Sequence, residues 1–255
     1  MPDIFENAEG LKFTRKLVNG KYEVLVPSFM DVHDWWGNWE TARFASMDKW
    51  LKPGMLLYEI GAFDGWQSAI LARFVGGGEN MVLVEPVKEN WANIKATWEA
   101  NGIAPPKESY CGLIGPNNPN LSDTEDLLTP KVYMGWPNDK WPGGPDYSKL
   151  IAVTKFKHIS ENTHDTPTLP LDFLIMGTPD AINIDVEGAE LIVLKSGEFT
   201  LRNQSPLVWL SVHPEFMRER YGHQPEQIEE FMRSLGYRAE FLGNDHEQHW
   251  IWRKS

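Results

Sequence analysis

The chain has 255 residues, of which 42% are hydrophobic and 24% are charged, a composition typical of a folded globular protein rather than of a disordered chain. Its formal net charge of −12, with Lys and Arg scattered along the sequence, argues against binding to nucleic-acid phosphates or to an anionic membrane surface. The one cysteine, Cys111, allows no internal disulfide and no cysteine-rich metal site, and without a recognisable signal peptide or an apolar run of about 18 residues the expected location is the cytoplasm.

Residues 1–50 are predicted to form an N-terminal arm followed by a helix on the substrate side. Within KLVNGKYEVLVP, the pair Asn19-Gly20 separates two β-rich runs, which is the pattern of a tight hairpin. The segment 31–50 then predicts a loop that enters an amphipathic helix, and Pro53-Gly54 ends that helix.

From residue 51 onward, apolar strands alternate with helices, which predicts a parallel sheet covered on both faces. We expect strands at 55–60, 80–86, 108–115, 181–186 and 206–213, helices at 65–74, 88–102, 187–195 and 225–236, and a closing hairpin from 237–242 and 249–254. Residues 116–168 interrupt this alternation and are rich in Pro, Gly, Asn and Asp, as in a lid or small insertion. The domain is therefore predicted to span 51–255, with an insertion at about 116–168.

A glycine-containing turn follows the first of these strands. In YEIGAFDGW, Gly61 and Gly65 stand between strand and helix, where glycines let the backbone approach a bound nucleotide. The spacing lacks the full G-x-G-x-x-G of dinucleotide-binding proteins, and Glu59 and Asp64 add negative charge that disfavours a pyrophosphate. We therefore expect this turn to bind a ligand with a cationic ammonium or sulfonium group. The alternative is a structural turn that binds no ligand.

Glu85 ends the next strand, some twenty residues beyond the glycine turn. An acidic side chain at this spacing can accept hydrogen bonds from ribose hydroxyls. A solvated acid at a strand end is the structural alternative, but the combination with the glycine turn favours a nucleoside ligand.

Three carboxylates occur within INIDVEGAELIVL, and a histidine ends the strand that follows. Asp185 lies at the carboxyl end of strand 181–186, where open α/β sheets bind their ligands. Glu187 and Glu190 are expected in the first turn of the next helix, whose dipole stabilises acids, so a structural role is an alternative for both. His213 ends the neighbouring strand and can face Asp185. Asp185, Glu187 and His213 are therefore the candidate catalytic residues.

The same three side chains could hold a hard divalent ion such as Mg²⁺. Their spacing does not separate a metal site from a metal-free base, and we expect the metal-free arrangement.

Several segments, in the order LLYEIGAFDGWQSAIL, MVLVEPVKENWANI, TLPLDFL, INIDVEGAELIVLKSG and VWLSVHPE, resemble the FkbM family of S-adenosylmethionine-dependent methyltransferases over about residues 50–215. The resemblance implies a Rossmann-like class I methyltransferase fold, with a mostly parallel seven-stranded sheet and a C-terminal antiparallel hairpin. It implies S-adenosylmethionine as cofactor and a hydroxyl of a sugar or polyketide-like molecule as acceptor. The residues that match its cofactor loop and ribose-binding acid are Glu59, Gly61, Ala62, Asp64, Gly65 and Glu85.

The acceptor is expected to lie where the chain departs from the family pattern, before residue 50 and in 116–168. Trp136 and Trp141 are candidate substrate-binding residues in the insertion, because indole faces stack on sugar rings. Trp35, Trp36 and Trp39 form a second aromatic group. The alternative is that the insertion tryptophans only attach this segment to the body.

We therefore expect an O-methyltransferase that acts on a sugar, a glycan or another small molecule. His213 would take the proton from the acceptor with Asp185 beside it, so that the rate falls below about pH 6, although the reverse assignment is an alternative. A catalytically silent, ligand-binding member of the family is the second interpretation. A nicotinamide-dependent oxidoreductase is disfavoured by the incomplete glycine motif, and a nucleic-acid methyltransferase by the net charge. The oligomeric state is not predicted.

Overall fold

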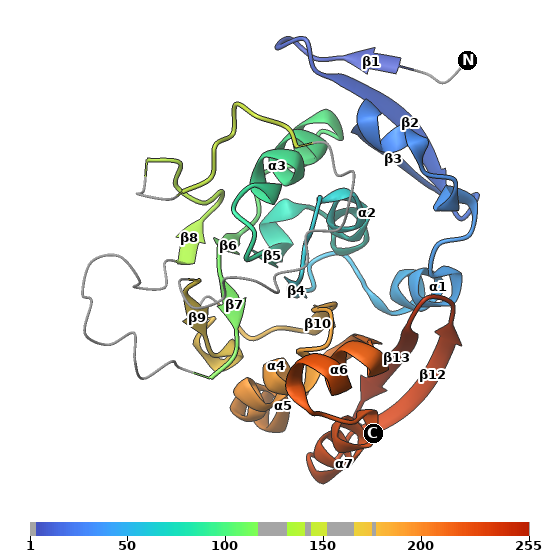
Figure 1. Cartoon of the computed structure of the whole chain (residues 1–255), viewed down its shortest axis with the longest axis vertical. Helices are drawn as coiled ribbons and strands as arrows, with labels where there is room; N and C mark the ends of the chain where they lie inside the picture. The colour runs from blue at the N-terminus through green and yellow to red at the C-terminus, as the bar shows by residue number, and fades with distance from the viewer. Residues whose placement is uncertain (1–3, 117–131, 141–143, 152–165, 175–176, 255) are drawn as a thin grey trace.

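The computed structural model describes residues 4–116, 132–140, 144–151, 166–174 and 177–254 (Figure 1). Most of the insertion predicted at 116–168 lies outside these ranges. Within the part of the chain that is described, no helix combines the length and the apolar character needed to cross a membrane.

An eight-stranded, mostly parallel sheet runs through the centre, in the order β12-β13-β11-β10-β4-β5-β6-β8. Its parallel strands are β4 (Leu57–Ile60), β5 (Met81–Val84), β6 (Glu108–Tyr110), β10 (Ala181–Ile184) and β11 (Leu207–Val212). The hairpin of β12 (Arg238–Asn244) and β13 (Gln248–Arg253) closes one edge, with β13 antiparallel to β11. The predicted Rossmann-like α/β fold with its C-terminal hairpin is confirmed.

The strand count differs from the expected seven because the insertion contributes a strand of its own. β8 (Val132–Met134) pairs antiparallel with β6 at the edge opposite the hairpin (Figure 1). The strand expected at 108–115 is also divided. The chain bends at Gly112, where an added Cβ would lie 2.5 Å from the Tyr110 ring, and β7 (Leu113–Ile114) then pairs with β9 (Thr168–Leu169) in a separate small sheet.

Helices cover both faces of the sheet. On one face lie α1 (Thr41–Trp50), α2 (Trp66–Val75) and α3 (Asn90–Ala100), and on the other α4 (Glu190–Ser196), α5 (Glu198–Gln204), α6 (Pro214–Tyr221) and α7 (Pro225–Ser234). α5 and α6 were not predicted from the sequence. The helix expected at 187–195 begins three residues later, because Glu187 and Gly188 have φ of 53° and 106° and form a turn.

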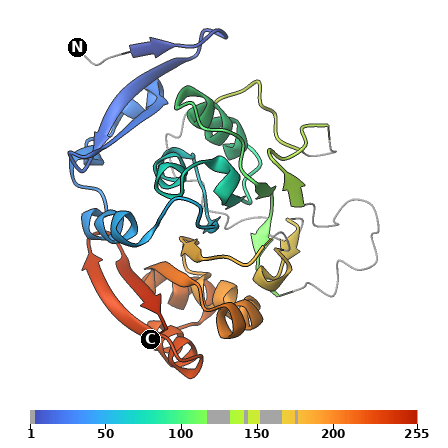
Figure 2. The same cartoon turned by 180° about the vertical axis from the view of Figure 1, so that it is seen from behind.

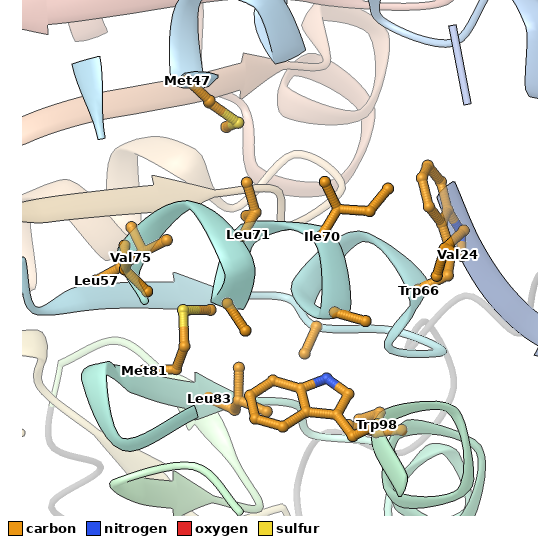
Figure 3. Close-up of a cluster of buried hydrophobic side chains, with 14 of the residues drawn as sticks. Val24, Met47, Leu57, Trp66, Ile70, Leu71, Val75, Met81, Leu83 and Trp98 are labelled. Carbon is orange, nitrogen blue, oxygen red and sulfur yellow. The ribbon is translucent and has the colours of Figure 1, made fainter. Parts of the chain in front are cut away.

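Alternate residues of β4 face the two helical layers. Leu57 joins the apolar cluster beneath α2 (Figure 3), whereas Tyr58 and Ile60 join the cluster on the other side. Figure 3 shows Met81 and Leu83 from β5 continuing the first cluster below Leu71. By the two-residue period of a strand, Glu59 points to the same side as Leu57, and it is only 1% exposed. A buried acid on this face needs a charged or polar partner.

The N-terminal arm is a three-stranded sheet of β1 (Ile4–Glu6), β2 (Lys12–Val18) and β3 (Tyr22–Pro27). Asn19 and Gly20 have φ of 53° and 67°, which confirms the predicted tight turn. The arm packs on the body, since Val24 and Val26 belong to the same apolar cluster as α2 and α3. Short 3-10 helices, η1 (Ser28–Val32) and η2 (Trp35–Gly37), lead into α1, and η3 (Gly78–Asn80) and η6 (Leu171–Phe173) occur in later loops.

The Asn101 side chain joins the arm to the end of α3 in the way a neighbouring strand would. Its Oδ1 accepts the Leu25 N–H at 2.9 Å and its Nδ2 donates to the Leu25 carbonyl at 2.7 Å. Both backbone groups of one β3 residue are thus satisfied by a single side chain.

Asn101→Ala should lower the free energy of unfolding by about 1–3 kcal/mol, because it leaves partly buried backbone groups without partners. The matched control is Asn203→Ala, whose side chain makes one exposed bond to Phe199. That control should change stability by less than about 0.5 kcal/mol in urea denaturation. Equal losses in the two variants would contradict this role of Asn101.

Candidate active site

The predicted site residues lie together at the end of the sheet where the parallel strands β4, β5, β10 and β11 have their carboxyl ends. Gly61 and Ala62 follow β4, and their N–H groups both donate to the Val84 carbonyl, at 2.9 and 3.0 Å. Asp185 follows β10 and donates its N–H to the Ile60 carbonyl at 3.0 Å. The cofactor-type loop and Asp185 are therefore joined through the backbone.

Both glycines of the loop are required by the packing of the chain itself. Gly61 has φ of 96°, and a Cβ there would lie 1.9 Å from the Asp185 carbonyl oxygen. Gly65 has φ of 85°, and its Cβ would lie 2.6 Å from the Ile94 Cα. A side chain at Gly61 would thus collide with Asp185 before it obstructed any ligand.

Glu85 is buried and holds the loop from β5. Its Oε2 accepts the Phe63 N–H at 2.8 Å, and its Oε1 accepts the Val87 N–H at 2.9 Å and the Asn90 amide at 3.2 Å. Burial raises the pKa of the Glu85 carboxyl to about 7, although these donors favour the charged form.

Two more acids lie beneath the loop. Asp64 is 2% exposed, and burial raises its pKa to about 7 against a hydrogen bond from the Trp66 backbone. Burial likewise raises the pKa of Glu59 well above its usual range, with the Arg43 charge acting in the opposite direction. In the part of the chain that is described, Glu59 Oε2 is buried without a hydrogen-bond partner.

Arg43 is a buried cation of the site that was not predicted from the sequence. It reaches from α1 onto the face of the sheet and is 1% exposed. Its Nη1 donates to Glu40 Oε2 at 2.5 Å and to Asp185 Oδ2 at 3.2 Å, and its Nη2 donates to Asn183 Oδ1 at 2.6 Å. The guanidinium fixes one oxygen of Asp185.

Asp185 keeps its second oxygen and part of its surface available. Oδ1 lies 3.8 Å from His213 Nε2, beyond hydrogen-bond distance, and the side chain is 21% exposed. The two predicted partners thus meet, but without a direct bond.

His213 is held between two buried carboxylates. Its Nδ1 lies 2.7 Å from Glu190 Oε1 and its Nε2 lies 2.5 Å from Glu247 Oε2. Ionised carboxylates only accept hydrogen bonds, so both ring nitrogens carry a proton. Burial favours the neutral ring, but the hydrogen bonds to Glu190 and Glu247 and the Asp185 charge outweigh it and raise the pKa of His213 to about 11.

This arrangement corrects the expectation that His213 is the free base. The imidazole has no nitrogen left to accept a proton, and the predicted fall in rate below about pH 6 does not follow from it. Glu190, weighed as a helix-start acid, is a partner of His213 and also accepts the Gly188 N–H at 2.9 Å.

Glu187 lies at the rim of the site. Its side chain is 43% exposed, and its Oε2 is 4.0 Å from His213 Nε2. Burial of part of the side chain raises its pKa, which the His213 charge counteracts. One donor atom each from Asp185, Glu187 and His213 lies within 4.8 Å of the others, so the predicted grouping forms.

The predicted substrate tryptophans do not line this site in the described residues. Trp136 lies two residues after Met134, which pairs with Glu108 at the start of β6. It is therefore near the amino ends of the parallel strands, away from the site at their carboxyl ends. Its ring centroid is 5.5 Å from that of Trp98. It attaches the insertion to α3. Trp141 lies outside the described residues.

The second aromatic group lies closer to the site. The ring centroid of Trp39 lies 6.3 Å from that of Trp66, the residue after Gly65, and 4.4 Å from that of His246 in the hairpin turn. Its neighbours Trp35 and Trp36 extend the cluster.

The profile of the FkbM methyltransferase domain matches residues 59–239. The chain therefore belongs to the FkbM methyltransferase family and contains a methyltransferase domain. A comparison with functionally curated proteins found no match.

Several similar solved structures are methyltransferases, at low identity. The FkbM methyltransferase from Methylobacillus flagellatus KT is 13% identical with a TM-score of 0.48, and the match covers 78% of this chain and 43% of that one. A precorrin-6y C5,15-methyltransferase from Geobacter metallireducens GS-15 is 10% identical with a TM-score of 0.45, covering 85% and 88%. M. jannaschii TYW2, solved with AdoMet, is 9% identical with a TM-score of 0.42, covering 100% and 87%.

Gly61→Ala should destabilise the protein more than a glycine change in the same conformation elsewhere. Gly54 has φ of 90° with nothing within 4 Å of its Cβ position, so Gly54→Ala pays only the conformational cost, about 1–2 kcal/mol. The collision with Asp185 should add about 1–3 kcal/mol to the loss at Gly61. Urea denaturation of both variants measures the difference, and equal losses would contradict the packing role.

Proposed function

We propose that this member of the FkbM methyltransferase family uses S-adenosylmethionine to methylate a hydroxyl group of a sugar, a glycan or another small molecule. The observation that carries the proposal is the position of Asp185. Its backbone is packed against Gly61 of the cofactor loop, while its carboxylate is partly exposed beside Arg43 and His213.

The loop suits a cofactor with a cationic centre and sugar hydroxyls. Three buried carboxyl groups, Glu59, Asp64 and Glu85, surround it, and a bound cation would favour their charged form against the rise in pKa that burial causes. Among the described residues, the buried Glu59 Oε2 has no hydrogen-bond partner. Glu85 Oε2 accepts one backbone N–H, and a carboxylate oxygen can accept a second donor, such as a ribose hydroxyl. When bound, S-adenosylmethionine supplies a methyl group carried on positively charged sulfur.

Asp185 is the proposed general base. A sugar hydroxyl is a weak nucleophile at neutral pH, so a positioned proton acceptor accelerates transfer to oxygen by about 10²–10⁴. His213 is occupied by Glu190 and Glu247, whereas Asp185 Oδ1, 3.8 Å from the imidazole, has no hydrogen bond to any described residue. Arg43 orients the carboxylate through Oδ2.

The acceptor is proposed to be a small molecule or glycan rather than a nucleic acid. A chain with a net charge of −12 repels phosphates, and the aromatic cluster at Trp39 offers a surface for a sugar ring. The charge also disfavours an anionic membrane, and with the one cysteine supports a cytoplasmic location.

Glu85→Gln should weaken binding of S-adenosylmethionine at least tenfold, because hydrogen bonds to a charged acceptor are worth about 1.5–3 kcal/mol each. Calorimetry measures this against Glu89→Ala, an exposed acid four residues away that should bind as the parent does. NAD should bind to neither of these two variants. Parent-like affinity in Glu85→Gln would contradict the ribose assignment.

Asp185→Asn should lower kcat by about 10²–10⁴ and leave the affinity for S-adenosylmethionine within a few fold. The acceptor is first identified by mass spectrometry of a glycoside and small-alcohol panel. Glu219→Gln, an exposed acid on α6, is the control and should keep the parent kcat. A fully active Asp185→Asn would remove Asp185 as the base, and cofactor binding without turnover of any hydroxyl compound would favour the ligand-binding alternative.

A further inference from the structure

A second group of donor side chains converges where α1 begins against the turn of the β12–β13 hairpin (Figures 1 and 2). Glu40, Glu247 and His249 are all buried, and one donor atom of each lies within 4.8 Å of the others. His246 Nε2 lies 3.7 Å from Glu40 Oε1 and 3.4 Å from Glu247 Oε1. His249 Nδ1 lies 4.0 Å from Glu247 Oε1.

Both glutamates of this group are fixed through the oxygen that points away from it. Glu40 Oε2 accepts from Arg43 Nη1 at 2.5 Å, and Glu247 Oε2 accepts from His213 Nε2 at 2.5 Å. Such outer partners orient metal ligands and leave the other oxygen to face the ion.

The two histidines follow the same pattern through one carboxylate. Asp245 Oδ1 lies 3.1 Å from His246 Nδ1 and 2.9 Å from His249 Nε2. A carboxylate behind an imidazole fixes the ring and makes its other nitrogen a better ligand. All four side chains thus present one donor atom inward and one anchored atom outward.

One carboxylate oxygen of this group points to a cation. Among the described residues, Glu247 Oε1 is buried without a hydrogen-bond partner, on a side chain that is 5% exposed. Acidic side chains outnumber the cations Arg43, His213 and Arg220 in this region. The acidic side chains are Glu40, Glu59, Asp185, Glu187, Glu190, Asp245 and Glu247.

We propose that Glu40, His246, Glu247 and His249 form a binding site for a divalent transition-metal ion, with Zn²⁺ as the best match. Two imidazole nitrogens with two carboxylate oxygens suit Zn²⁺ and its neighbours, whereas Mg²⁺ and Ca²⁺ prefer oxygen alone. Tetrahedral Zn²⁺ places its donors about 3.3 Å apart, and the separations of 3.4, 3.7 and 4.0 Å exceed this by less than about 1 Å. The Ser211 hydroxyl, 3.2 Å from His249 Nδ1, would give up that contact.

This site differs from the grouping of Asp185, Glu187 and His213, and it does not depend on the methyl donor. It joins residues about two hundred positions apart in the chain, so an ion here would tie α1 to the hairpin. Through Arg43 and His213, it would also hold the two cations that flank Asp185.

The test begins with chelator-treated protein dialysed against Zn²⁺ and analysed for bound metal. We expect one ion per chain and a thermal midpoint that rises with Zn²⁺ concentration. His246→Ala should bind Zn²⁺ at least tenfold more weakly, and its side chain is 42% exposed, so the variant should fold. His223→Ala changes a histidine that follows the end of α6 and stacks near Tyr221, and this control should retain parent affinity.

Two further measurements make the assignment specific. Co²⁺ in the parent should give the visible absorption of a four-coordinate nitrogen and oxygen site, and Glu247→Gln should abolish it. The Asp185→Asn/Glu187→Gln double variant should keep both the stoichiometry and the spectrum. The proposal is overturned if the parent takes up no stoichiometric Zn²⁺, or if the double variant loses the ion while His246→Ala keeps it.

Discussion

The site depends on the hydrogen bonds that the buried Arg43 guanidinium donates to its neighbours. Taking an arginine out of water costs several kcal/mol unless its donors are satisfied and its charge is balanced. Here Glu40, Asn183 and Asp185 accept from it, and these acceptors come from the start of α1 and from the end of β10. The same contacts fix α1 on the sheet and keep neighbouring carboxylates from repelling one another. Removing the cation would leave an acidic cluster without compensation.

His213 is a second buried cation, and it differs from Arg43 in its proton chemistry. An arginine never gives up its proton under ordinary conditions, but a histidine normally does. Between Glu190 and Glu247, His213 also keeps both protons, so it stabilises charge and does not exchange it. In the proposed mechanism, a carboxylate therefore takes the proton. Asp185 is better placed than Glu187, because Arg43 and the Gly61 contact hold it against the cofactor loop.

The sequence predicted the elements whose signals are local. Strand ends, the glycine turn and the IDVEGAE segment occupy short windows, and they place Gly61, Glu85 and Asp185 at one sheet edge because parallel strands end together. Arg43 carried no such signal, since a basic residue on a helix is ordinarily solvated. The hairpin turn GNDHEQ indicated only a turn, although Asp245, His246 and Glu247 within it, and His249 directly after it, are residue types that bind metal ions. Trp136 was misplaced because the antiparallel pairing of β8 could not be deduced from composition.

The contact between Gly61 and Asp185 gives the glycine motif a second meaning. Glycines in such turns are usually explained by the approach of a ligand to the backbone. In this chain the Gly61 Cα faces the Asp185 carbonyl so closely that no side chain fits, and the Asp185 N–H is bonded to the carbonyl of Ile60. The cofactor loop and the proposed base are therefore one packed unit. A change at Gly61 must move Asp185, so loss of cofactor binding and loss of catalysis at this position would share a single structural cause.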